Sequence, residues 1–346
     1  MDFKSYLKIT ADKIEREIEG ILGDFRKEVN KINPKLIPLV DAFIEACQGG
    51  KRLRGTLVKL GYELATGPVD PRNDVLKIGA AYEIFHTSIL AHDDIADQSS
   101  LRRGKPTLYQ ALGGDHYGLS QALGLADIGF FLSAKLIADS NFSPQVKSKA
   151  LSFFIQTIIN TGLGQVLDVE VPHLGGERKE EDVISIHKLK TAQYTISGPL
   201  VLGAILAGAE QDLIRELGEF GENLGIAFQI QDDILGVFGD EKTLGKSVTS
   251  DIEEGKNTLL VTEALKKADA KQLRILEQYY GKGDLGDQGL KEVKKAFLET
   301  GSLDYSRQMG VKYVVKAKSI IPKITKDKIV VSILTEMADF LVEREK

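Results

Sequence analysis

Apolar residues recur along this chain at the period of an α-helix, and this period restricts the possible folds more than any other feature of the sequence. Ile14, Ile18 and Ile21 show it near the N-terminus, because residues three or four positions apart share one face of a helix. Longer helical tracts extend over about Val75–Asp97, Tyr117–Ala138, Gln145–Glu170, Glu180–Ala207 and Leu213–Val237. Alternation of apolar and polar residues, which marks strands, is nearly absent. The sequence therefore predicts an all-α fold.

Several of these tracts are apolar around most of their circumference, so we expect them at the centre of a helical bundle. The 346-residue chain shows neither a low-complexity linker nor a short internal repeat. We therefore predict one large helical-bundle domain over residues 1–346. The lack of a fixed period argues against a helical-repeat scaffold.

Composition and charge exclude several classes of protein. Lys and Arg number 45 and Asp and Glu 50, with both signs mixed along the chain, so we expect no nucleic-acid partner. The single cysteine, Cys47, allows no intrachain disulfide, and we expect it to be buried. The N-terminal stretch is charged and unlike a signal peptide. The longest apolar run, Gly198–Gly208, is shorter than the roughly 20 residues that cross a bilayer. We predict a cytoplasmic protein that is not an integral membrane protein.

The first of two aspartate clusters lies at the end of the tract Val75–Asp97. At 100° per residue, Asp93 and Asp97 are neighbours on one helical face, with His86 and Tyr82 within about 20° of the same line. Asp94 lies about 100° away. Like charges at this spacing repel, and a helix C-terminus disfavours negative charge. Mg²⁺ suits such a place, since it takes few carboxylates together with waters and a phosphate. The alternative interpretation is a solvated helix end.

The second cluster, Asp232-Asp233, interrupts an apolar stretch of the last long tract. Adjacent aspartates there are costly without a counter-charge. Gln229 lies within one turn of Asp232. An ion pair with a basic residue elsewhere in the chain could explain one such cluster. Two clusters, each followed by a basic loop, instead favour metal ions bound between two helices of a bundle.

Basic residues accompany both clusters. Two glycines precede Lys51, Arg52 and Arg54 at a predicted helix start, where backbone N–H groups and cations together suit a diphosphate. The other cations near the clusters are Arg102, Arg103, Lys190 (followed by Thr191), Lys246 and Lys256. Gln165 and Asp168 form another polar pair on an apolar helix. A functional role for this pair and a structural role in capping or core hydrogen bonding are equally good interpretations.

These motifs, in this order, resemble those of the trans-type (class I) isoprenyl diphosphate synthases, the farnesyl and geranylgeranyl diphosphate synthase family. The matching segments extend over about residues 49–256: Gly49 to Arg54, Asp93 to Asp97 with Arg102 to Gly104, Gly164-Gln165 with Asp168, Lys190-Thr191, Phe228-Gln229 with Asp232-Asp233, and Gly245-Lys246 with Asp251 and Lys256. The resemblance implies an all-α bundle around a central apolar cavity, a homodimer, and three Mg²⁺ ions per active site.

The resemblance also implies a role for each matching residue. Asp93, Asp97 and Asp232 would bind Mg²⁺, and the catalytic set would be Asp93, Asp94, Asp97, Lys190, Thr191, Gln229 and Asp232. The allylic diphosphate would be held by Arg102, Lys190, Thr191, Gln229, Lys246 and Lys256, and isopentenyl diphosphate by Lys51, Arg54, His86 and Arg103. The second motif departs from the common pattern, because Gly236 stands where a third aspartate is usual. Asp233 and Asp240 therefore become uncertain ligands.

In this family the residues just before the first aspartate motif set the floor of the product pocket. The residues concerned here are Tyr82, Phe85, Ser88 and Ile89. We expect the small Ser88 to leave the first layer open and Phe85 to close the pocket behind it. The predicted product is the C20 compound geranylgeranyl diphosphate, with the C15 and C25 products as alternatives.

The implied reaction is a Mg²⁺-dependent prenyl transfer. The allylic diphosphate (dimethylallyl, geranyl or farnesyl) ionises when cations neutralise its leaving group, and the double bond of isopentenyl diphosphate attacks the resulting cation. A dry apolar chamber is needed, because water would trap that cation. A class I terpene cyclase is a rival interpretation, although it needs no second diphosphate site. A non-catalytic partner subunit is a third, although it would be expected to lose aspartates.

Overall fold

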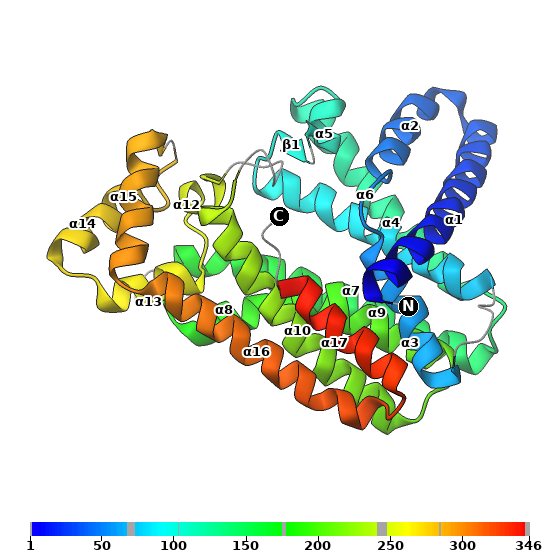
Figure 1. Cartoon of the computed structure of the whole chain (residues 1–346). Coiled ribbons are helices and arrows are strands. Elements are labelled where there is room, and N and C mark those ends of the chain that lie inside the picture. The colour runs from blue at the N-terminus through cyan, green and yellow to red at the C-terminus, as the bar shows by residue number, and fades with distance from the viewer. Residues whose placement is uncertain are drawn as a thin grey trace. The chain divides into compact units, whose positions relative to one another are not determined.

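The computed structural model describes residues 2–67, 73–102, 104–174, 178–240, 248–283 and 285–342, and they are almost entirely helical (Figure 1). Within these ranges the only strands are β1 (Leu101–Arg102) and β2 (Lys105–Pro106), which form one short antiparallel pair. The prediction of an all-α fold is confirmed.

The chain groups into two compact units. The first comprises Met1–Thr157, Gly198–Gly218 and Lys323–Ile333, and the second comprises Ile158–Ser197, Glu219–Pro322 and Leu334–Lys346. Helices α7, α10, α16 and α17 each contribute residues to both. A single domain over residues 1–346 stays a prediction.

The first unit begins with the antiparallel helices α1 (Phe3–Ile32) and α2 (Ile37–Ala46), which lie side by side (Figure 1). A 3₁₀ turn (Pro34–Leu36) joins them. The unit continues with α3 (Leu53–Thr66), α4 (Asn73–Ala96), α5 (Leu108–Ala111), α6 (His116–Ala138), the first half of α7 (Pro144–Glu170), and α9 (Gly198–Leu206). Its core includes Ile14, Phe43, Ala80, Ile84 and Leu125.

Helices α3 and α9 approach so closely that each needs a glycine at the contact. A Cβ atom on Gly61 would lie 2.0 Å from the carbonyl oxygen of Leu200, and one on Gly203 would lie 2.0 Å from that of Val58. Because these oxygens belong to backbone, they cannot move aside. Cys47 is buried in this unit, as expected, and burial raises the pKa of its thiol to about 12, so the thiol stays protonated.

The second unit contains the remainder of α7, a 3₁₀ turn (Val171–His173), α8 (Glu180–Ile186), a π-helix (His187–Ser197) and most of α10 (Gln211–Phe238). It continues with α12 (Ser250–Glu253), α13 (Leu259–Lys267), α14 (Ala270–Tyr279), α15 (Gly286–Glu299), α16 (Ser302–Ile324) and part of α17 (Lys328–Val342). Helices α14 and α15 pack on each other (Figure 1). The core of this unit includes Val183, Ile230, Ile234, Leu260 and Phe297.

The predicted helical tracts agree with the observed helices to within about two residues, with one exception. The tract Glu180–Ala207 is divided into α8, the π-helix and α9. The apolar run at Gly198 is α9, which is mostly buried. By length and composition alone, His116–Ala138 and Pro144–His173 could each cross a membrane, although a core helix of a soluble protein passes the same test.

Candidate functional site

The end of α4 places Asp93 and Asp97 one helical turn apart. The backbone N–H of Asp97 donates to the carbonyl oxygen of Asp93 at 2.8 Å, so Asp97 continues the helix although it follows the last residue of α4. Gln98 then takes a left-handed conformation with φ +52° and ends the helix. Both aspartates are half-buried. The two carboxylates therefore share one face, as a metal site requires.

Asp94 points elsewhere and forms an ion pair with Arg102. Its Oδ1 atom lies 2.7 Å from Arg102 Nε and 2.6 Å from Nη2. Asp94 is only 3% exposed, and this burial raises the pKa of its carboxyl, an effect that Arg102 opposes. The same Nη2 lies 3.7 Å from Asp93 Oδ2. Asp94 thus anchors a guanidinium beside Asp93 and makes no third carboxylate on the face of Asp93 and Asp97.

The glycine-rich segment before α3 is a tight loop. Gly49, Gly50 and Arg52 have φ angles of +75°, +95° and +50°, a region in which glycine is favoured. Arg52 is buried, where it pairs with Glu15 and donates from Nη2 to the carbonyl of Cys47 at 2.7 Å. Lys51 is exposed. Of the cations here, Arg52 is structural, which leaves Lys51 and Arg54 as the diphosphate candidates.

Aromatic rings surround the predicted floor of the product pocket. Phe85 is fully buried, with ring centroids 5.5 Å from Tyr82, 5.1 Å from Phe154 and 5.9 Å from Phe130. Ser88 is also fully buried, and a Cβ atom on Gly129 of α6 would lie 2.1 Å from its hydroxyl oxygen. The small size of Ser88 therefore also serves the close approach of α4 to α6. Ile89 is half-buried.

In the second unit, Lys190 and Thr191 lie in the π-helix, which divides the helical tract predicted over Glu180–Ala207. Two neighbouring helices approach the backbone of this segment closely, and each has a glycine at the point of contact. A Cβ atom on Gly164 of α7 would lie 2.3 Å from the backbone nitrogen of Lys190, and one on Gly225 of α10 would lie 2.5 Å from Ala192 Cα. The wider π turn is a recurrent feature of functional sites. Here the glycines let α7 and α10 hold it from two sides.

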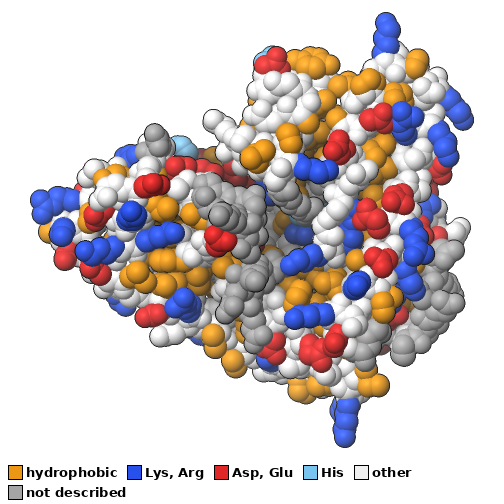
Figure 2. Space-filling view, turned by 45° about the horizontal axis from the view of Figure 1, so that its top comes forward, with side chains coloured by type: hydrophobic (Ala, Val, Ile, Leu, Met, Phe, Trp, Pro, Cys, Tyr) orange, Lys and Arg blue, Asp and Glu red, His pale blue; other side chains and the backbone are white. Residues whose placement is uncertain are grey.

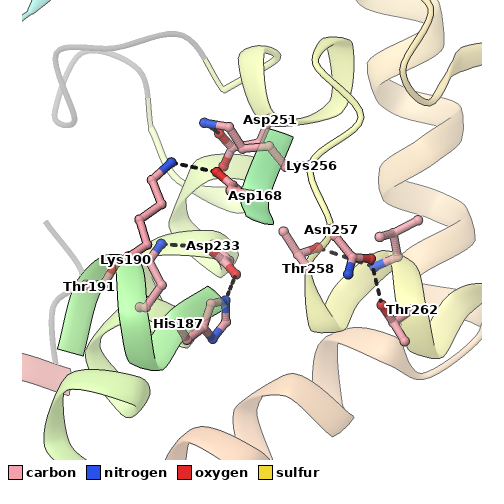
Figure 3. A network of polar contacts seen from close by, with 12 residues as sticks. Asp168, His187, Lys190, Thr191, Asp233, Asp251, Lys256, Asn257, Thr258 and Thr262 are labelled. Atoms are coloured by element: carbon pink, nitrogen blue, oxygen red, sulfur yellow. Dashed lines mark hydrogen bonds and ion pairs between the residues drawn. The ribbon is translucent and has the colours of Figure 1, made fainter. Parts of the chain in front are cut away.

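Two polar contacts join these residues to neighbouring helices. Lys190 Nζ lies 2.6 Å from Asp168 Oδ2 (Figure 3). The hydroxyl of Thr191 donates to Gln229 Oε1 at 2.7 Å, and Gln229 Nε2 donates to Asp233 Oδ1 at 2.8 Å. Because the amide nitrogen is committed to a carboxylate, the amide oxygen of Gln229 must face Thr191.

His187 completes this network, and sequence reasoning missed it. Its Nε2 atom lies 3.0 Å from Asp233 Oδ2 (Figure 3), and the ring is 3% exposed. A carboxylate only accepts, so Nε2 is the donor. Asp233, an uncertain metal ligand from the sequence, therefore holds the Gln229 amide in place. The one signal in the sequence was the position of His187, three residues before Lys190.

Lys256 is held by its backbone and by two carboxylates. Arg178 Nη1 donates to its carbonyl oxygen at 3.2 Å, and the hydroxyl of Tyr280 donates to the same oxygen at 2.6 Å. Its Nζ atom lies 3.4 Å from Asp251 Oδ1 and 3.1 Å from Glu254 Oε2. The side chain of a predicted diphosphate ligand thus starts from a fixed backbone.

The other predicted site residues differ in their burial and location. His86 and Tyr82 are buried on α4, Asp232 is half-buried on α10, and Asp240 is exposed beyond the end of α10. Arg103 and Lys246 lie outside the described residues.

The donor set fits Mg²⁺. Among the described residues, no three Asp, Glu, His or Cys side chains are gathered as a self-contained metal cage. Mg²⁺ rarely uses such cages, since it keeps several waters and shares one or two carboxylates with substrate phosphates. The carboxylates of Asp93 and Asp97, on one face of a helix, match that preference.

Comparison with known proteins agrees with this interpretation of the site. The polyprenyl synthetase family matches residues 38–297. The chain is 34% identical to a geranylgeranyl diphosphate synthase of Sulfolobus acidocaldarius over 86% of this chain and 88% of that protein. It is 34% identical to a geranylfarnesyl diphosphate synthase of Aeropyrum pernix, over 86% of this chain and 91% of that protein. A geranylgeranyl pyrophosphate synthase of Corynebacterium glutamicum, solved with isoprenyl diphosphate and magnesium, superposes with a TM-score of 0.91 at 26% identity, covering 99% of this chain and 100% of that one.

Proposed function

Because this chain belongs to the polyprenyl synthetase family, and is therefore a short-chain prenyltransferase that depends on Mg²⁺, we propose that it elongates allylic diphosphates with isopentenyl diphosphate to geranylgeranyl diphosphate. The observation that carries this choice of product is the packing of Phe85 among three other rings on the helix that bears Asp93. A wall of rings at this depth limits the length of the growing chain.

The carboxylates that would hold Mg²⁺, three ions per active site, are those of Asp93, Asp97 and Asp232. Bound Mg²⁺ neutralises the negative charge that accumulates on a departing diphosphate. Arg102 is already oriented toward Asp93 by its ion pair with Asp94, so its cation needs little reorganisation when a diphosphate arrives.

The basic side chains divide between the two diphosphates. Arg102, Lys190 and Lys256, together with Lys246, bind the allylic diphosphate, whereas Lys51, Arg54, His86 and Arg103 bind isopentenyl diphosphate. In the structure Lys190 and Lys256 pair with the carboxylates of Asp168, Asp251 and Glu254. Such pairing limits the rotation of each ammonium group until phosphate oxygens compete for it.

Thr191 and Gln229 stabilise the allylic cation by their oxygen dipoles. The two side chains are hydrogen-bonded to each other, and the Asp233–His187 pair fixes which end of the Gln229 amide faces Thr191. An amide held in this way cannot rotate to present its N–H₂ group, which would oppose a positive charge. Diphosphate that has left can accept the final proton, so no His or Cys nucleophile is required.

The function is tested by supplying isopentenyl diphosphate with dimethylallyl, geranyl and farnesyl diphosphates, with and without a chelator. We expect each primer to be elongated to a C20 product, and the activity to vanish on chelation and return with Mg²⁺. A main product of C15 or C25 would change the product assignment alone. Cyclised products without consumption of isopentenyl diphosphate would contradict the proposed reaction and favour a terpene cyclase, and no turnover would favour a non-catalytic subunit.

We also propose that the protein is a homodimer joined through exposed apolar residues of α7. These are Ile155, Ile159, Leu163 and Val166, spaced along one face of this single helix. Monomeric proteins seldom expose such a stripe. The same helix could cross a bilayer by length and composition, but a second copy related by a two-fold axis would cover the stripe without a membrane. A cytoplasmic location agrees with this proposal.

The dimer is tested by Leu163→Glu, which puts a charge on a side chain that is 56% exposed within the stripe. We expect light scattering after size exclusion to give a dimeric mass for the wild type and a monomeric mass for the variant, since burying the charge would be costly. Ile329→Glu is the control, because Ile329 is 65% exposed but lies on α17, outside the stripe. A wild-type monomer, or a variant that stays dimeric, would refute this interface.

A further inference from the structure

Lys256, one of the proposed ligands of the allylic diphosphate, lies in the short connection between α12 and α13 (residues 254–258). Gly255 in this α12–α13 connection takes a left-handed conformation with φ +69°. The carbonyl oxygens of an irregular segment need hydrogen-bond partners from other parts of the chain. The position of the Lys256 side chain therefore depends on what holds the connection.

Arg178, which precedes α8, holds the α12–α13 connection through one nitrogen of its guanidinium. Its Nη1 atom lies 3.0 Å from the carbonyl oxygen of Gly255 and 3.2 Å from that of Lys256. The same atom lies 3.4 Å from Oδ1 of Asn257, which is buried. Hydrogen bonds from a charged donor are stronger than neutral ones. A single side chain therefore fixes three consecutive residues, although it lies 77 positions before the first of them.

Tyr280, which follows α14, contacts both the connection and Arg178. Its hydroxyl donates to the carbonyl oxygen of Lys256 at 2.6 Å, and its ring centroid lies 5.4 Å from Arg178 Cζ, a distance suited to a cation–π contact. The next residue, Gly281, touches the backbone of the connection, because a Cβ atom on Gly255 would lie 2.9 Å from Gly281 Cα. Arg178 and Tyr280 thus hold the backbone of Lys256 together, and all of these residues belong to the second compact unit.

The exact position of Lys256 matters because the charges on the surface are mixed. Figure 2 shows Lys and Arg side chains interspersed with Asp and Glu side chains over the visible face. Mixed charges produce little net field at a distance, so individual cations must hold an anion at short range. Figure 3 shows Lys256 close to Asp168, which pairs with Lys190. Two proposed ligands of the allylic diphosphate therefore share one region.

We propose that Arg178 and Tyr280 are positioning residues for prenyl transfer, which fix the backbone from which Lys256 reaches the allylic diphosphate. The inference rests on the proposed function. Neither residue belongs to the motifs by which the sequence resembles the family, and neither touches the substrate in this account. Because they act through Lys256, their loss should weaken the use of the allylic substrate and spare that of isopentenyl diphosphate.

Steady-state kinetics of the full-length protein test this proposal, with one substrate varied while the other is saturating. We expect Arg178→Ala to raise KM for farnesyl diphosphate about tenfold and to leave KM for isopentenyl diphosphate within about twofold of the wild type, because a small displacement of a binding group is costly. In a Lys256→Ala background the same substitution should change KM for farnesyl diphosphate by less than about twofold, because the side chain that it positions is gone. A residue that merely stabilises the fold would have the same effect in both backgrounds.

Tyr280→Phe is a milder variant, since it removes one hydroxyl, and Tyr305→Phe is its matched control. The hydroxyl of Tyr305 donates to Glu180 in the same compact unit and not to the connection. We expect Tyr280→Phe to raise KM for farnesyl diphosphate about threefold, as the loss of one hydrogen bond does, and Tyr305→Phe to leave it unchanged.

Three results would overturn the inference: an equal rise in KM for both substrates, an undiminished effect of Arg178→Ala in the Lys256→Ala background, or equal effects of Tyr280→Phe and Tyr305→Phe. Thermal melts identify variants that do not fold, and Tyr280→Phe decides the matter if Arg178→Ala is one of them. A wild-type protein that does not elongate farnesyl diphosphate would refute the proposed function alone. Mg²⁺-dependent binding of inorganic diphosphate, measured by calorimetry on the same variants, would then test the inference.

Discussion

Replacing Asp93 with alanine should lower kcat/KM for prenyl transfer by about a thousandfold. Asp93 and Asp97 share the end of α4, and Asp93 also faces the guanidinium of Arg102. Without the Asp93 carboxylate, the site would neutralise the leaving diphosphate less well at the moment its charge develops, and single groups with that role are worth about 10²- to 10³-fold or more. Steady-state kinetics with farnesyl and isopentenyl diphosphates measure the effect.

The control for this experiment is Asp139→Ala. Asp139 belongs to the same compact unit and is exposed, where it pairs with Lys135. Surface pairs of this kind contribute little, so we expect kinetics within about twofold of the wild type. An Asp93→Ala enzyme with near-wild-type kcat/KM would show that the first cluster is not a metal site.

Replacing Phe85 with alanine should change the main product from C20 to C25 or longer. The fully buried ring packs against Tyr82, Phe154 and Phe130, and its removal opens a space that one more five-carbon unit can enter. The same change removes core contacts and should cost about 3–5 kcal/mol of unfolding free energy. Chromatography of the dephosphorylated products and a denaturant titration measure the two effects.

Phe142→Ala is the matched control for this prediction. Phe142 is buried in the same unit but packs near Tyr62, with ring centroids 6.3 Å apart, away from the rings around Phe85. We expect a similar loss of stability with C20 still the main product. An unchanged chain length in Phe85→Ala would show that Phe85 does not set the product length and would leave Tyr82, Ser88 and Ile89 as the candidates.

The helices could be predicted because their apolar pattern is local and long. The tract Val75–Asp97 agrees with α4 to within about two residues, and the 100° spacing that groups Asp93 with Asp97 needs nothing beyond the helix itself. The π-helix at Lys190 could not be predicted in the same way. Its backbone is pressed by α7 at Gly164 and by α10 at Gly225, and such contacts depend on how distant segments pack.

The difference between local patterns and contacts of distant segments also explains which site residues could be predicted from the sequence. Motif residues such as Asp232 carry their signal in neighbouring positions, whereas His187 acquires its role from Asp233, 46 residues later. From the sequence, the small size of Ser88 was interpreted as an opening in the pocket. The structure adds a second reason for this size, because Ser88 lies close to Gly129 on α6.

A double-mutant cycle of Asp93→Ala and Asp232→Ala tests most directly our proposal that the two aspartate clusters act on one metal-bound diphosphate. Calorimetry would measure Mg²⁺-dependent binding of inorganic diphosphate to the wild type, both single variants and the double variant. We predict that the losses are not additive, with a coupling free energy of about 1–3 kcal/mol, as for groups that share a bound partner. Losses that add to within about 0.5 kcal/mol would mean that the clusters work independently and would contradict the account.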